Sequence, residues 1–516
     1  MAIENRILIN FDSDKKYINP MIYSNFIEHI GECIHNGIWA YDPVKVPLLK
    51  GNPRLIGVRE DLLKAIRDMK VTVLRWPGGC YSDVYHWKDA IGLRGSRKVV
   101  KNIHWSKFDK AFPGIGPIIQ NQFGTDEYLT FCEKINAEPY MNINYGTATP
   151  EEAAEWVEYC NGSINTQYGK LRAKNGRKKP YNVKIWGIAN EIYGFWEPGY
   201  EKNPVDYATK YLTFAKKMRE KDPKIKLVAC GWDRSDWNQP LLRKLGEKFV
   251  DYISIHRYFP DEAGKFTGQK HPDNITCYHA LMASKPLIEG YINKTWEDII
   301  TALGTDTHVK IAFDEWGVWY LFKDTIKTNY NLQDGLWTAM VLMTLQKMTD
   351  KCPMANWAQL VNCIGTIQTD PNGLILTPVY LAFKILNDHC FTHLIEGIEI
   401  TSQSFNSKKF GMIPESENVP YIECNTTIND AGDEISITLI NKHFESEISV
   451  DLELNGFIPN DVGLKVELSS DSPFDYNTVE NRTKIEIKES KIDSLSPNMS
   501  IDLRPHSLTI LKLKKK

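Results

Sequence analysis

The first 385 residues alternate short apolar runs with amphipathic stretches, and this alternation limits the fold more than any other feature of the chain. The apolar runs predict strands at residues 21–27, 71–76, 139–144, 183–189, 225–230, 252–256, 309–314 and 356–361. Helical spacing recurs between them, for example at residues 59–69, 125–135, 150–159, 207–220 and 333–348. Eight alternating βα units favour a closed parallel (β/α)8 TIM barrel. A doubly wound sheet is the competing architecture, but no glycine-rich dinucleotide or phosphate loop follows a predicted strand.

After about residue 390, apolar and polar residues instead alternate with period two. Examples are Glu434-Ile-Ser-Ile-Thr-Leu-Ile, Glu447-Ile-Ser-Val-Asp-Leu-Glu-Leu and Thr483-Lys-Ile-Glu-Ile, with turn residues between them. This pattern predicts an antiparallel β-sandwich. We therefore expect an α/β chain with a catalytic barrel at residues 18–385 and a sandwich at residues 386–516. An N-terminal strand within residues 1–17 is expected to join the sandwich, because residues 6–11 alternate in the same way.

The charge balance restricts the partners of this chain. Among 516 residues, 62 are Lys or Arg and 65 are Asp or Glu, which gives a formal net charge of −3. This balance argues against nucleic acid or an anionic membrane as a partner. The chain shows no signal-peptide pattern, no apolar run of about 18 residues and no Cys-x-x-Cys pair. We expect free thiols and a cytoplasmic location, with no membrane partner.

Two predicted strands lead directly into glutamates. Residues 183–189 are followed by Asn190 and Glu191, and residues 309–314 are followed by Glu315. The carboxyl ends of barrel strands share one face, so the two carboxylates are expected to meet there. A pair of carboxylates on one face can cleave a glycosidic bond. The alternative is that each acid only starts a loop or caps the next helix.

The motifs around these glutamates resemble those of glycoside hydrolase family 51, whose members are mainly α-L-arabinofuranosidases. The six motifs, which occur in the family's order within residues 20–385, are Asn25-Phe-Ile-Glu-His-Ile-Gly, Leu74-Arg-Trp-Pro-Gly-Gly, Trp186-Gly-Ile-Ala-Asn-Glu, Tyr252-Ile-Ser-Ile-His-Arg-Tyr, Phe313-Asp-Glu-Trp-Gly-Val-Trp-Tyr and Ala358-Gln-Leu-Val-Asn. The glutamates after strands four and seven are shared by a larger clan of enzymes, so it is the six motifs together that make the resemblance specific to this family. The resemblance also implies a barrel with a C-terminal sandwich and retention of anomeric configuration.

The resemblance implies a role for each catalytic and supporting residue. Glu191 would be the general acid/base and Glu315 the nucleophile. Arg75 would help to keep Glu315 ionised, because an opposite charge stabilises a carboxylate. His256 lies on the same face, where both a supporting core position and a substrate contact remain open.

The resemblance also implies which residues bind the sugar. Asn190 would bind the 2-hydroxyl, Glu28 and Gln359 would bind other hydroxyls, and Tyr258 would hold the nucleophile in place. Cys80 is a departure, because the family's second motif often has a sugar-binding Asn at this position. A thiol is a weak hydrogen-bonding group, so the departure bears on the substrate more than on the reaction type.

No metal or other cofactor is expected. The residues Glu28, His29, Glu32, Cys33 and His35 cluster in the sequence, but their spacing fits no tight zinc pattern. The family's chemistry also needs no metal.

We therefore predict a retaining exo-glycosidase that releases terminal non-reducing α-L-arabinofuranosyl groups from arabinan- or arabinoxylan-derived oligosaccharides. The nearest alternative is the same fold and mechanism acting on a β-xyloside or a β-glucan. A non-catalytic carbohydrate-binding protein is the alternative from another class. Because members of the family are often hexamers, we also expect a homo-oligomer.

Overall fold

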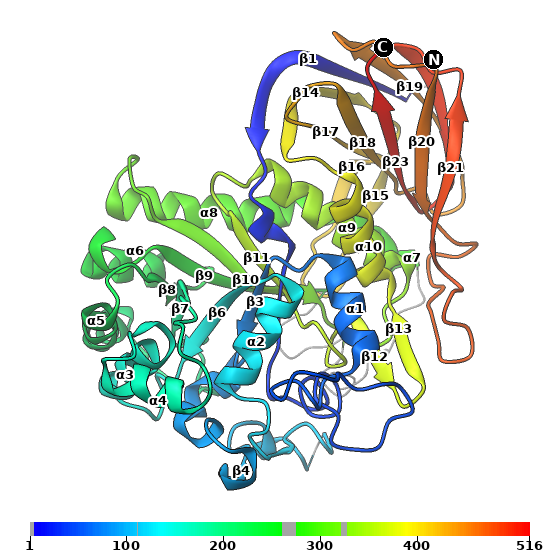
Figure 1. Cartoon of the computed structure of the whole chain (residues 1–516). Coiled ribbons are helices and arrows are strands. Elements are labelled where there is room, and N and C mark those ends of the chain that lie inside the picture. Colours follow the sequence, from blue (N-terminus) through cyan, green and yellow to red (C-terminus); the bar gives the residue numbers. More distant parts are fainter. Residues whose placement is uncertain (1–4, 111, 261–274, 321–327) are drawn as a thin grey trace.

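The computed structural model describes residues 5–110, 112–260, 275–320 and 328–516. A body rich in helices forms the lower part of Figure 1, and a body of strands lies above it together with both chain termini. None of the helices in these residues is long and apolar enough to cross a membrane.

Eight parallel strands form a closed barrel, which confirms the predicted fold class. Around the barrel they are β10 (Lys310–Val318), β11 (Met354–Ala358), β2 (Ser24–Phe26), β3 (Val73–Trp76), β6 (Glu138–Ile143), β7 (Ile185–Ile188), β8 (Lys226–Cys230) and β9 (Tyr252–Phe259). Their residues are mostly buried from both sides, so the sequence shows continuous apolar runs in place of alternation.

Helices cover the outside of the barrel (Figure 1). They are α1 (Glu60–Met69), α2 (Thr125–Ile135), α3 (Pro150–Asn161), α4 (Gln167–Lys174), α5 (Pro204–Lys221), α6 (Ser235–Leu245), α7 (Ile275–Ala283), α8 (Lys285–Leu303), α9 (Leu332–Lys347) and α10 (Pro378–His389). Local sequence sets where several of them begin. Thr149 caps α3 by accepting a hydrogen bond from the Glu152 backbone, and a proline follows the cap.

Some strand bounds differ from those expected. The first barrel strand is shorter than residues 21–27, because Pro20–Tyr23 form a 3-10 turn capped by the Asn19 side chain. In contrast, β9 and β10 extend beyond their expected ends at residues 256 and 314. Tyr258 and Glu315 therefore lie within strands, which fixes their backbone more firmly than a loop would.

The remaining large sheet has nine strands. Their order is β21 (Ile487–Asp493), β20 (Val462–Leu468), β23 (Ser507–Lys514), β18 (Glu434–Asn441), β17 (Ile422–Ile428), β14 (His393–Thr401), β1 (Arg6–Tyr17), β19 (Ile448–Asn455) and β22 (Asn498–Leu503). All neighbours pair antiparallel except β1 and β19, which are parallel. One buried cluster combines apolar side chains of β1, β18, β19, β22 and β23, so the sheet folds over a core of its own.

Three short hairpins complete the strand set. They pair β4 (Val100–Lys101) with β5 (Ile118–Ile119), β12 (Ile367–Asp370) with β13 (Gly373–Leu376), and β15 (Ser404–Ser407) with β16 (Ser416–Pro420). The segment expected as a strand at residues 483–487 mostly precedes β21, which begins only at Ile487.

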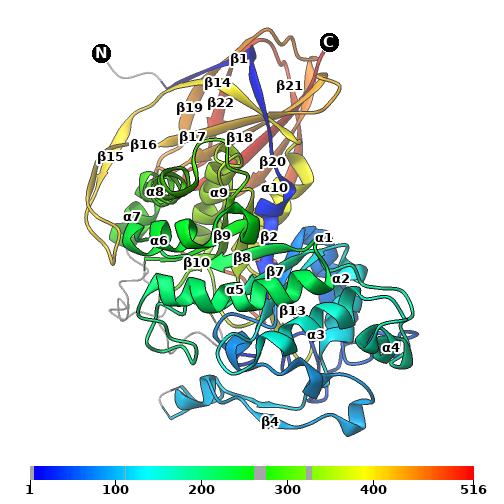
Figure 2. The ribbon, with the colours of Figure 1, turned by 90° about the vertical axis from the view of Figure 1, so that its left-hand side faces the viewer.

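The face of the large sheet that is turned away from its own core packs on the barrel helices (Figure 2). Ile440, Leu508 and Ile510 of this sheet belong to the main buried cluster of the barrel. Asn425 Nδ2 donates to the carbonyl of Met343 in α9, so a buried hydrogen bond also joins the two parts. The α10 helix spans the expected boundary at residue 385, and we propose that the division falls after this helix.

Candidate active site

Two glutamates and a histidine meet at the carboxyl end of the barrel. One oxygen of Glu191, one oxygen of Glu315 and a ring nitrogen of His256 all lie within 4.8 Å of one another. His256 Nδ1 is 2.8 Å from Glu191 Oε1 and 3.6 Å from Glu315 Oε2. The side chains of Glu191 and Glu315 are 18% and 8% exposed, so a substrate can reach carboxylates that are otherwise shielded from water.

The backbone around Glu191 adopts a conformation that non-glycine residues rarely use. Ala189 and Glu191 have φ angles of 78° and 42°, in the left-handed region. Such strain persists only where the surrounding structure enforces it, and it is common at functional sites. Here it turns the chain sharply after β7 and places the Glu191 carboxylate beside His256.

The Glu315 carboxylate is held by two hydrogen-bond donors. Arg75 Nη1 donates to Oε1 at 2.8 Å and the Tyr258 hydroxyl donates to Oε2 at 2.7 Å. Arg75 Nη2 also donates to Asn190 Oδ1 at 2.7 Å, so one buried guanidinium orients both side chains. Gly79 passes close by, because a Cβ at this residue would lie 2.7 Å from Glu315 Oε1.

A second buried carboxylate, Asp314, supports His256. Asp314 accepts hydrogen bonds from Tyr140 and Ser254, and its Oδ1 is 3.3 Å from His256 Nε2. Burial alone would raise the pKa of Asp314, but Arg75 and His256 lower it to about 2. Asp314 therefore keeps a fixed negative charge behind the imidazole.

The imidazole of His256 is protonated on both ring nitrogens, and therefore positively charged, at neutral pH. Burial opposes the charge, but the nearby Glu315 and the hydrogen bonds to Asp314 and Glu191 raise the pKa of His256 to about 10. The pKa of Glu191 is lowered despite its burial, mainly by the hydrogen bond from His256. In the free protein the proton of this pair therefore rests on Nδ1, next to Glu191 Oε1.

Glu28 forms another wall of the same site. Its Oε1 accepts from the Tyr81 backbone at 2.8 Å and from Trp105 Nε1 at 2.9 Å, and its Oε2 accepts from Gln359 Nε2 at 3.3 Å. Burial, together with the charge of Glu315, raises the pKa of Glu28 to about 7. Glu28 can therefore accept or donate a hydrogen bond near neutral pH. Gly78 leaves the space for Glu28, since a Cβ there would lie 2.3 Å from its Cγ.

Asn190 connects the glutamates to Cys80. Asn190 Nδ2 lies 3.9 Å from Cys80 Sγ and 3.4 Å from Glu197 Oε1. Burial and the charges of Asp83 and Glu191 raise the pKa of Glu197 well above its ordinary value. A thiol thus occupies the position next to Asn190, in contact with a buried carboxyl group.

Comparison with known proteins identifies the family. Profiles described as "Alpha-L-arabinofuranosidase 1 domain" and "Alpha-L-arabinofuranosidase C-terminal domain" match residues 65–274 and 314–507. Alpha-L-arabinofuranosidase C of Emericella nidulans is 31% identical over 98% of this chain and 97% of its own length. The chain belongs to glycoside hydrolase family 51, the family of α-L-arabinofuranosidases. It is therefore a glycoside hydrolase, as the sequence predicts.

Two further relatives support this assignment along the whole chain. The intracellular exo-alpha-L-arabinofuranosidase of Bacteroides ovatus is 30% identical over 98% of this chain and 95% of its own length. The crystal structure of the Thermotoga maritima alpha-L-arabinofuranosidase in complex with arabinose is 34% identical, with a TM-score of 0.88, and covers 99% of this chain and 100% of that one. The family 51 assignment thus includes the large sheet as well as the barrel.

The residues singled out in the sequence of this family 51 chain gather at the carboxyl end of its barrel. They form one network of contacts around the two glutamates and comprise Glu28, Arg75, Cys80, Asn190, Glu191, His256, Tyr258, Glu315 and Gln359. Their roles in binding and catalysis stay predictions.

Sequence reasoning missed several residues of this family 51 site. Trp105 contacts Glu28 from 77 positions away, and Glu197 and His104 lie behind Cys80. No local pattern marks these residues, because their contacts depend on how the long loops after the strands fold back. Trp196 could have been found, since it follows Glu191 in the same loop, and its Nε1 donates to Glu191 Oε2 at 3.2 Å.

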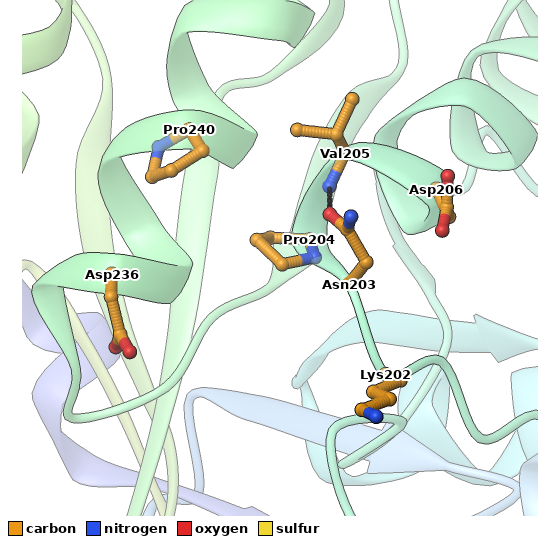
Figure 3. Close-up of a pocket in the computed structure, with 7 residues that line it drawn as sticks. All are labelled: Lys202, Asn203, Pro204, Val205, Asp206, Asp236 and Pro240. Atoms are coloured by element: carbon orange, nitrogen blue, oxygen red, sulfur yellow. Dashed lines mark hydrogen bonds between the residues drawn. The ribbon is translucent and has the colours of Figure 1, made fainter.

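A separate hollow of about 530 Å³ lies between the start of α5 and the helix α6 (Figure 3). It is lined by Lys202, Asn203, Pro204, Val205, Asp206, Asp236 and Pro240. Asn203 Oδ1 caps α5 by accepting from the Val205 backbone at 2.8 Å, so this side chain has a structural role (Figure 3). None of the lining residues belongs to the carboxylate network, which remains the candidate active site of this family 51 chain.

Proposed function

We propose that this protein releases terminal non-reducing α-L-arabinofuranosyl groups with retention of configuration, with Glu315 as nucleophile and Glu191 as general acid/base. One observation carries the proposal: an oxygen of each carboxylate lies within 4.8 Å of the other at the mouth of one barrel. Retaining glycosidases hold their carboxyl groups about 5–5.5 Å apart, whereas inverting enzymes need about 6.5–9.5 Å to admit a water. An upper limit of 4.8 Å between one oxygen of each carboxylate is on the short side of these separations between whole groups, and it favours the retaining geometry.

In the first step, Glu315 attacks the anomeric carbon and the glycosidic oxygen leaves with a proton from Glu191. The His256–Glu191 hydrogen bond of 2.8 Å supplies this proton, because transfer from Nδ1 to Oε1 gives a neutral imidazole and a protonated acid. Displacement of water by the sugar favours the transfer, since a low dielectric disfavours separated charges without solvation. In the second step, Glu191 takes a proton from water, which attacks the glycosyl-enzyme and releases arabinose with Glu315 restored.

The surrounding side chains fit the binding of a small, hydroxyl-rich ring. Asn190 is oriented by Arg75 and would bind the 2-hydroxyl, while Glu28 and Gln359 present polar atoms from another wall. Within the part of the chain that the structure describes, Gln359 Oε1 is buried with no hydrogen-bond partner, so it is available for a sugar hydroxyl. Unpaired buried polar atoms are costly, so their presence in a substrate site supports a polar ligand.

We further propose that the substrates are imported oligosaccharides derived from arabinan or arabinoxylan and that the enzyme works in the cytoplasm. The relative from Bacteroides ovatus carries the word intracellular in its name, which supports this location. The family resemblance supports a homo-oligomer, and a hexamer is the assembly to test by analytical ultracentrifugation.

The two glutamates can be separated by azide rescue. Glu191→Ala should still form the glycosyl-enzyme from a substrate with an acidic phenol leaving group, and azide should then release an azide product of retained configuration. On natural linkages the loss should reach roughly 10²–10⁴-fold, the usual contribution of general acid/base catalysis. Glu315→Ala should lose activity on every substrate, because a good leaving group cannot replace the missing attack.

The products are identified by NMR, and wild-type activity on aryl α-L-arabinofuranoside and aryl β-D-xyloside is compared in parallel. Azide rescue of Glu315→Ala to a retained product, with none for Glu191→Ala, would show that the roles are reversed. A clear preference for the xyloside would favour the alternative substrate class.

A further inference from the structure

Three side chains close to Asn190 have possible metal-ligand atoms that lie near one another. Cys80 Sγ, a ring nitrogen of His104 and a carboxylate oxygen of Glu197 all lie within 4.8 Å of each other. His104 Nδ1 and Glu197 Oε2 are 4.0 Å apart, too far for a hydrogen bond. The three come from segments that the fold brings together: the turn after β3, the loop before α2 and the loop after β7.

Two of these atoms have no hydrogen-bond partner among the described residues. His104 Nδ1 and Glu197 Oε2 are both buried without a hydrogen bond, and the side chains are only 1% and 0% exposed. A buried polar atom without a partner is costly. Two such atoms only 4.0 Å apart indicate a place where one additional ligand could bind to both of them.

We propose that Cys80, His104 and Glu197 form a Zn²⁺ site whose occupancy inhibits the enzyme. Zinc is bound by thiolate, imidazole and carboxylate at about 2.0–2.3 Å, and tetrahedral bonds of this length place the ligand atoms about 3.3–3.8 Å apart. The trio therefore needs to contract by about 1 Å. A thiolate and a carboxylate together neutralise the 2+ charge, and a water would complete the coordination.

The other trio of possible ligands, Glu191, His256 and Glu315, is not a comparable metal site. Its atoms are already occupied, because His256 Nδ1 bonds Glu191 and both oxygens of Glu315 accept hydrogen bonds from Arg75 and Tyr258. It also has no sulfur ligand. The two trios can therefore be distinguished by spectroscopy.

Asn190 links the proposed zinc site to catalysis. Its Nδ2 lies within reach of both Cys80 Sγ and Glu197 Oε1, and its backbone leads directly to Glu191. A zinc ion that draws Cys80 and Glu197 together would change the contacts that orient Asn190. Inhibition follows, because Asn190 is the proposed partner of the sugar's 2-hydroxyl, a contact that strengthens in the transition state.

The experiment is a Co²⁺ titration of the metal-free, full-length protein, followed by displacement with Zn²⁺. Cobalt bound by a thiolate gives a near-ultraviolet charge-transfer band, and tetrahedral coordination gives intense visible bands. The wild type should show both, and Cys80→Ser should lose the charge-transfer band. Cys390→Ser is the matched control, because Cys390 is the other cysteine that is only partly buried. It should keep the spectrum of the wild type.

His104→Gln separates zinc binding from catalysis. This variant should bind Zn²⁺ at least ~100-fold more weakly, and Zn²⁺ concentrations that inhibit the wild type should leave its hydrolysis of an aryl arabinofuranoside at the rate that the same variant shows in metal-free buffer. The inhibition assay depends on the proposed activity, whereas the cobalt spectrum does not. Absence of a thiolate–cobalt band in the wild type, or unchanged Zn²⁺ affinity in His104→Gln, would refute the site. Zinc bound at Cys80 without inhibition would refute its link to catalysis.

Discussion

The close approach of Gly79 to Glu315 gives a direct test of the position of the nucleophile. In Gly79→Ala, the new Cβ would lie 2.7 Å from Glu315 Oε1 and 3.5 Å from the Asn190 amide. An ordinary contact needs about 3.2 Å or more, so the carboxylate must retreat by about 0.5 Å. Misplacement by about 1 Å can cost on the order of 10²-fold in rate, so we expect a loss of about 10-fold in kcat.

The assay is the single-turnover release of an activated phenol, with the melting temperature measured on the same samples. Gly290→Ala is the matched control, because it lies within α8 and no atom of the described residues lies within 4 Å of its new Cβ. It should keep full activity and gain slightly in stability, since alanine favours helix over glycine by about 1 kcal/mol. A Gly79→Ala variant that melts like the wild type and keeps kcat within twofold would refute the placement of Glu315.

Two further substitutions test individual contacts of the site. Burial raises the pKa of Glu28 to about 7, above the unfolded value of about 4.3, so ionisation destabilises the fold as pH rises through this interval, by about 4 kcal/mol when complete. Glu28→Gln avoids this cost, and Gln359 can flip its amide so that its oxygen accepts a hydrogen bond from the new amide. The melting temperature of the variant, relative to that of the wild type, should therefore be higher above pH 7 than near pH 4. An equal difference at both pH values would contradict the assignment. Tyr258→Phe removes the 2.7 Å hydrogen bond that orients Glu315, and a bond to a charged group is worth about 1.5–3 kcal/mol. It should lower the single-turnover rate by roughly 10- to 100-fold and should also lower the melting temperature slightly, because the same bond stabilises the free protein. A loss of rate below threefold would show that Arg75 alone holds the carboxylate.

The barrel could be predicted from sequence because its strands are buried from both sides and its helices are amphipathic. The predicted bounds of α2 at residues 125–135 agree with the structure, those of α1 differ by one residue at the start, and those of α9 differ by one residue at each end. The first strand was predicted too long, because the apolar residues before Ser24 form a buried 3-10 turn that periodicity cannot distinguish from a strand.

The site was only partly predictable, for a related reason. Glu191 and Glu315 follow apolar strands directly, so the fold class alone brings them to one face. Glu197, His104 and Trp105 instead lie in long loops, and their positions depend on contacts between segments far apart in the chain. The pairing of His256 with both Asp314 and Glu191 also required the register of β9 against β10.

The place of β1 in the large sheet has a consequence for how the chain is made. β1 ends at Tyr17, yet its partners β14 and β19 begin only at His393 and Ile448. At about 5–20 residues per second, a ribosome needs on the order of a minute to reach them. During that time the strands of the barrel can pair with one another, whereas β1 has no partner strand yet. Its charged end, with Asp12, Asp14, Lys15 and Lys16, suits this interval, because charges on an unpaired strand discourage association with other chains.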